Sequence, residues 1–78
     1  MKIFELTTNG KHGYYKYLVR GIKTDEEGIK LAKKVFGKYA WIPGGVTYYA
    51  DVGKEYCWGK VPSMTVAQFL KLKKTEFK

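Results

Sequence analysis

The sequence predicts an α+β domain in which two helices pack on an antiparallel sheet of four to five strands. Three observations predict this class. Short segments alternate apolar and polar residues, two threonine-led capping motifs each precede a run with helical apolar spacing, and turn residues separate the segments. The expected order is β-β-α-β-β-(β)-α. A chain of 78 residues has room for a single domain, 1–78.

The first two strands form a predicted hairpin. Residues 2–8 alternate and place Phe4 and Leu6 on one face. Asn9-Gly10 is a strong turn signal, because both residues tolerate a positive φ, and residues 14–22 return. One face of the returning strand carries Tyr15, Tyr17 and Val19, and the other carries Tyr14, Lys16, Leu18 and Arg20.

A capping box opens the first predicted helix, since the Thr24 hydroxyl can accept from the Glu27 N–H while Glu27 reaches back. Gly28 falls toward the apolar side, where the missing side chain would let the helix approach the sheet closely. Gly37 is placed to stop the helix in the left-handed conformation. The opposite face carries a stripe of three lysines: Lys30, Lys33 and Lys34.

Three further strands are expected over residues 38–42, 46–51 and 54–61, and Pro62 ends the last of them. The second helix is expected from Val66 to about Leu72, with Thr65 and Gln68 as its capping box. Residues 73–78 read as a frayed basic tail.

The stretch 54–61 carries the most distinctive pattern. Read as one strand, its first face presents two aromatic rings between two cations, namely Lys54, Tyr56, Trp58 and Lys60. The other face presents small residues, and Cys57 among them is expected to be buried and chemically inert. The competing interpretation places Tyr56 and Trp58 in the core beneath a helix.

Fifteen Lys and Arg residues against seven Asp and Glu give a net charge of +8, which favours a polyanionic or acidic partner. Rings that stack on bases and cations that meet phosphates are typical of single-stranded nucleic-acid binding. The sequence therefore predicts a small non-enzymatic module that binds RNA or another single-stranded nucleic acid. The predicted contact residues are Tyr14, Lys16, Arg20, Lys30, Lys33, Lys34, Lys54, Tyr56, Trp58 and Lys60.

Catalysis is not expected, and the sequence indicates no metal or cofactor site. The only histidine, His12, lies in a predicted turn without an orienting partner. A small basic ribonuclease is the enzymatic alternative, and it would use His12, Tyr14, Lys16 and Arg20. The lone cysteine fits a reducing cytoplasm, and neither a signal peptide nor a membrane span is expected.

The second functional hypothesis is a protein-binding surface at Trp41 and Ile42, because tryptophan is a favoured interface anchor. The start Met1-Lys2-Ile3-Phe4, the capped amphipathic helix, the single cysteine and the lack of an enzymatic motif also suggest a family. In these features the chain resembles the small, basic, Tyr- and Lys-rich accessory proteins of tailed phages. The resemblance implies an inhibitor or adaptor of a host protein, such as a defence nuclease or toxin, which it would bind either alone or together with its RNA.

Overall fold

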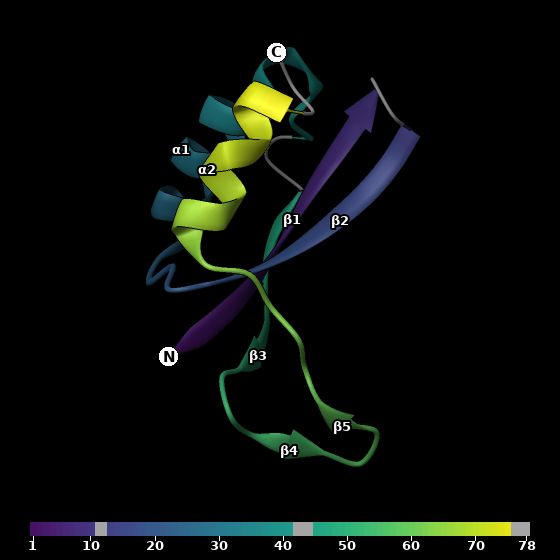
Figure 1. The fold of residues 1–78 in the computed structure, drawn as a ribbon, viewed down its shortest axis with the longest axis vertical. Helices are drawn as coiled ribbons and strands as arrows, with labels where there is room; N and C mark the ends of the chain where they lie inside the picture. Colours follow the sequence, from purple (N-terminus) through teal and green to yellow (C-terminus); the bar gives the residue numbers. More distant parts are fainter. Residues whose placement is uncertain (11–12, 42–44, 76–78) are drawn as a thin grey trace.

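The computed structural model describes residues 1–10, 13–41 and 45–75, and it confirms the α+β class with two helices and antiparallel strands (Figure 1). The elements in chain order are β1 (Lys2–Gly10), β2 (Gly13–Arg20), α1 (Asp25–Phe36), the 3₁₀ helix η1 (Gly37–Tyr39), β3 (Val46–Asp51), β4 (Glu55–Tyr56), β5 (Gly59–Lys60) and α2 (Val66–Thr75).

The main sheet has three antiparallel strands in the order β2-β1-β3, with the N-terminal strand in the centre. The predicted hairpin is confirmed by a register that pairs Phe4 with Val19 and Leu6 with Tyr17. Asn9-Gly10, predicted as the turn, belongs instead to β1, where Asn9 pairs with Tyr14. The tip of this hairpin lies outside the described residues. A register shift between Ile3 and Phe4 marks a bulge opposite β3.

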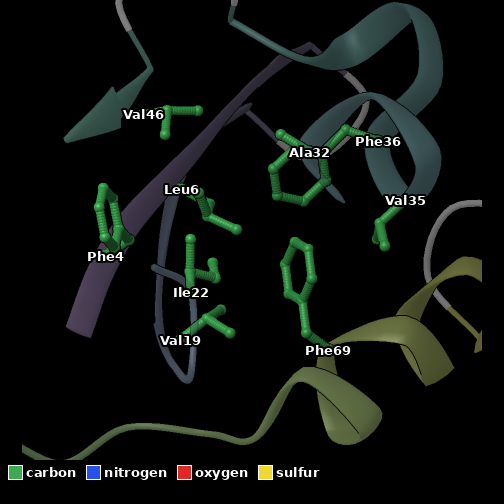
Figure 2. Close-up of a cluster of buried hydrophobic side chains, with 9 residues drawn as sticks. All are labelled: Phe4, Leu6, Val19, Ile22, Ala32, Val35, Phe36, Val46 and Phe69. Carbon is green, nitrogen blue, oxygen red and sulfur yellow. The ribbon is translucent and has the colours of Figure 1, made fainter. Parts of the chain in front are cut away.

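Both helices cover the same face of the sheet and run side by side in the same direction (Figure 1). They enclose a core to which both strands of the hairpin, β3 and both helices contribute (Figure 2). Its buried members are Phe4, Leu6, Val19, Ile22, Ala32, Val35, Phe36, Val46 and Phe69. The side of the sheet away from the helices is called the outer face below.

The start of α1 follows the predicted capping chemistry. The Glu27 N–H donates to Thr24 Oγ1 at 3.2 Å, while Glu27 Oε2 accepts from the Lys23 N–H at 3.1 Å. The returning bond thus reaches one residue further back than the standard box. Gly28 is buried, and a Cβ there would lie 2.6 Å from Val46 Cγ1. The close approach predicted for this glycine is therefore present.

The start of α2 is as expected, and α1 ends before Gly37 as expected but without the left-handed conformation predicted for this glycine. Gly37 follows the last residue of α1 with φ +60° and ψ −127°, so it has the positive φ but not the left-handed helical ψ. In α2 the Gln68 N–H donates to Thr65 Oγ1 at 3.1 Å, and the Thr65 N–H donates to Gln68 Oε1 at 2.9 Å. The helix continues to Thr75, past the end expected near Leu72, and residues 76–78 lie outside the described part.

The prediction of a strand over residues 38–42 is wrong. Residues 37–39 form η1, and only Ala40 makes a bridge, to Thr8. The Thr8 hydroxyl donates to the Tyr39 carbonyl at 3.0 Å, which fixes the turn against the sheet. Ile42 lies outside the described residues.

The single strand expected over 54–61 is also wrong. The segment folds back on itself as the small antiparallel pair β4–β5, with Tyr56 opposite Gly59 and a turn at Cys57-Trp58. Gly59 has φ +105°, a conformation that glycine adopts without strain. Cys57 is exposed at the turn, so the prediction that its thiol is buried fails as well.

After the β4–β5 hairpin the chain reaches the far edge of the sheet. The Met64 N–H donates to the Leu18 carbonyl and the Arg20 N–H donates to the Met64 carbonyl, both at 2.9 Å. This parallel contact, centred on Val19 and Met64, covers part of the free edge of β2. In the described part of the chain no helix combines the length and the apolar character needed to cross a membrane.

Candidate nucleic-acid interface

Among the described residues, the β4–β5 hairpin carries the most exposed aromatic side chain, Trp58. The Tyr56 and Trp58 rings stack with centroids 5.3 Å apart and planes 10° apart. Lys54 Nζ lies 5.2 Å from the centroid of the Tyr56 ring. Trp58 is 60% exposed, and within the described residues Tyr56 is the ring that stacks on it. A flat indole is thus presented to solvent beside a cation.

Hydrogen bonding at the end of β3 holds the stack in place. The Tyr56 hydroxyl accepts from the Asp51 N–H at 3.0 Å, which ties the hairpin to the main sheet. A hydrogen bond with Asp51 also raises the pKa of the Tyr48 phenol, and partial desolvation and the nearby Asp51 charge act in the same direction.

A second aromatic and cationic group lies on the outer face, at the start of β2. Tyr14 is 56% exposed, and Trp41 packs edge-on against it with ring centroids 4.9 Å apart. Lys16 Nζ lies 5.9 Å from the Tyr14 ring centroid and 3.6 Å from Glu5 Oε1. Figure 1 places the start of β2 and the β4–β5 hairpin at opposite ends of the long axis, along which the protein extends 35 Å.

Arg20 has a structural role as well as its predicted one. Its Nη1 donates to the Ser63 carbonyl and, at 3.3 Å, to Ser63 Oγ. These bonds join the end of β2 to the segment that leads into α2. Because Ile3, paired with Arg20 across the ladder, is fully buried, this end of the outer face is covered. Arg20 is therefore less available to a ligand than Lys16.

The predicted contact residues do not form one surface. Lys30, Lys33 and Lys34 are exposed on the far side of α1, because Gly28 and Ala32 turn the other side toward the core. The sheet and its core thus separate these lysines from Tyr14 and Lys16. The remaining cations, Lys54 and Lys60, are exposed on the hairpin, where Lys60 pairs across the ladder with Glu55.

Sequence reasoning missed two features. Tyr48 and Tyr49 of β3 are half exposed, and Lys2 Nζ lies 6.0 Å from the Tyr48 ring centroid. Lys38 and Lys73 line the same cavity as Lys33 and Lys34, where the two helices end. The clustering of lysine in the last turn of both helices was the available signal.

The predicted protein-binding residues are only partly placed. Trp41 is 41% exposed and rests on Tyr14, while Ile42 lies outside the described residues. His12, the acid–base candidate of the ribonuclease hypothesis, also lies outside them. Among the residues the structure describes, no cluster of three or more His, Cys, Asp or Glu side chains could hold a metal.

Comparison of the chain with protein-family models, with curated proteins and with solved structures gave no match. Its function therefore has to be inferred from its own residues.

Proposed function

We propose that this protein is a small non-enzymatic module that binds RNA or another single-stranded nucleic acid through the β4–β5 hairpin and the accessible end of the outer face. The observation that carries the proposal is the exposed Trp58 ring, stacked on Tyr56 with Lys54 beside it. An unpaired base can stack on the exposed face of the Trp58 ring, while lysines bind the flanking phosphates.

The energetics favour this use of the hairpin. Stacking of one base on an aromatic side chain contributes about 1–3 kcal/mol to the free energy of binding. In the absence of a ligand, an exposed ring such as Trp58 adds nothing to the packing of the core. The net charge of +8 attracts the phosphate backbone over a longer range. Lys16 lies beside the Tyr14 ring and Lys54 beside the Tyr56 ring, and Lys60 is a further exposed cation on the hairpin.

The test measures binding of a fluorescently labelled single-stranded RNA by anisotropy. We expect Trp58→Ala to weaken binding by about tenfold or more, because one stacked base is lost. The control is Val52→Ala, which shortens an exposed apolar side chain near the hairpin without touching a ring. Equal affinities of the wild type and Trp58→Ala would contradict the proposal.

Salt dependence provides an independent measurement. If three lysines neutralise phosphates, the logarithm of the affinity should fall with the logarithm of salt concentration with a slope of about −2 for a single strand. A flat salt response would remove the proposal. The RNA should stay intact during the incubation; cleavage that is lost in Arg20→Ala would instead favour the ribonuclease.

The second candidate is a phage-type inhibitor or adaptor that binds an acidic host protein. The exposed Trp41, held edge-on by Tyr14, favours this candidate because a pre-positioned indole is a typical interface anchor. A partner recovered from host lysate after nuclease treatment and lost in Trp41→Ala would support it. Loss of the partner on nuclease treatment would favour the nucleic-acid module. In either case we place the protein in the cytoplasm, where the exposed Cys57 thiol stays reduced.

A further inference from the structure

A lysine-rimmed cavity of about 390 Å³ lies where α1 and α2 end. Both helices end on the same side of the protein (Figure 1). The lining residues come from the last turn of α1, from η1 and from α2; they are Lys33, Lys34, Val35, Phe36, Gly37, Lys38, Tyr39 and Lys73. This place is on the helical side of the sheet, away from the outer face.

The charge around the cavity is strongly unbalanced. Among the residues that the structure describes, four of those lining the cavity are lysines and none is acidic. Lysines in the last turn of a helix normally offset its negative end, which amounts to about half an elementary charge per helix. Two helix ends together offset only about one of the four positive charges. For the described lining residues, roughly three positive charges therefore remain around one small space.

The lysines also lie at positions that are not needed to offset the negative ends of the helices. Lys38 lies beyond the end of α1, and its Nζ is 5.4 Å from the Tyr39 ring centroid. Lys73 comes from the other helix, yet lines the same cavity as Lys33 and Lys34. Beneath them Val35 and Phe36 are buried and form an apolar floor. The long lysine side chains thus surround an apolar floor that cannot neutralise their charge.

We propose that this cavity binds a compact polyphosphate, that is, two or three adjacent phosphoryl groups whose charge matches the excess of the lysines. A cavity of this size suits a small ligand rather than a protein surface. The phosphoryl groups can belong to a free polyphosphate or to the 5′-polyphosphate end of an RNA. The site is separate from the hairpin stack, and it does not rest on the function proposed above.

The experiment follows backbone amide shifts by NMR while sodium tripolyphosphate is added to the isotopically labelled protein at constant pH and ionic strength. We expect saturable shifts concentrated at residues 33–39 and at Lys73. The variants Lys34→Ala and Lys73→Ala should each weaken binding by roughly tenfold, because each removes a charged donor. The matched control is Lys30→Ala, which removes an exposed lysine of α1 that does not line the cavity.

Two results would overturn the proposal. One is the absence of saturable shifts, and the other is an equal loss of affinity in Lys30→Ala and Lys34→Ala, since that would mean diffuse attraction to the basic surface. Trp58→Ala should bind tripolyphosphate as the wild type does, so failure of the hairpin proposal would leave this result intact. Competition by 5′-triphosphate RNA but not by the 5′-hydroxyl RNA would identify the RNA end as a source. Competition by neither would leave free polyphosphate as the ligand.

Discussion

At the scale of single residues, Gly28 decides how closely α1 lies on the sheet. A methyl group there would have to occupy space 2.6 Å from Val46 Cγ1 and 3.6 Å from Leu6 Cδ2. Valine is stiff about χ1 and Val46 belongs to the core, so neither partner can move aside cheaply.

We therefore expect Gly28→Ala to lower the free energy of unfolding by about 1 kcal/mol, because overpacking outweighs the gain in helix propensity. Urea unfolding followed by circular dichroism measures this. Removing the obstructing methyls in Gly28→Ala/Val46→Ala should make the double variant more stable than the two separate losses predict. The control is Lys30→Ala, which changes an exposed position of the same helix. An increase in stability for Gly28→Ala would refute the close contact.

Features of this kind could be predicted from the sequence because they are local. Thr24 with Glu27, and Thr65 with Gln68, lie within one turn of each other, so their spacing predicts the bond that each threonine hydroxyl accepts from the N–H three residues on. The helical spacing of the apolar residues likewise specified the side of α1 on which Gly28 lies.

At the scale of elements, the β4–β5 hairpin differs from the rest of the fold. It pairs only with itself, and the Tyr56 hydroxyl provides a hydrogen bond to the main sheet. The sequence did not predict its turn, because Cys57 and Trp58 are not turn-forming residues and the alternation over 54–61 fits a strand equally well. Gly59 was the local signal. Tyr56 and Trp58 do lie side by side as predicted, but the turn between β4 and β5 brings their rings together, not the spacing of residues along one strand.

We expect the amides of residues 55–60 to exchange with solvent much faster than those of β1, because a two-stranded hairpin is marginally stable on its own. Tyr56→Phe should accelerate amide exchange in the hairpin by about fivefold relative to the wild type, since it removes one hydrogen bond but keeps the ring. Hydrogen–deuterium exchange read by NMR measures both effects.

The control for the hairpin is Tyr49→Phe, which removes the hydroxyl of an exposed tyrosine on β3 and should leave the exchange unchanged. Exchange in the hairpin as slow as in β1 would show that it is an integral part of the sheet.

At the scale of the whole molecule, exposed lysines lie in several separate places. The β4–β5 hairpin, the start of β2 on the outer face and the ends of the two helices each hold some of them. Composition predicted the excess of charge but not this division, because the side on which a residue lies depends on how the helices are placed on the sheet. The spacing of residues in the sequence predicted on which side of its own helix or strand each lysine lies, but not where that side lies in the folded protein.

Such an excess of like charge should make the fold more stable when salt is added. Raising the ionic strength from about 10 mM to about 100 mM shortens the Debye length from about 30 Å to about 10 Å, which screens repulsion between the lysines. We expect the free energy of unfolding in urea to increase over this range, since the Lys16–Glu5 ion pair, whose lysine is exposed, loses only a little of its attraction. A decrease would mean that attractive pairs dominate the charge interactions.

The place of Phe69 in the core has a consequence for the order in which the protein is made. Its ring is fully buried and packs edge-on against Phe36 at 5.3 Å and against Tyr17 at 6.0 Å, yet it belongs to the last helix of the chain. A ribosome that has released the first sixty residues has released the whole main sheet and α1, but not the side chain that seals them. Until α2 emerges, the nascent protein has an uncovered aromatic surface that is open to chaperones or to other nascent chains.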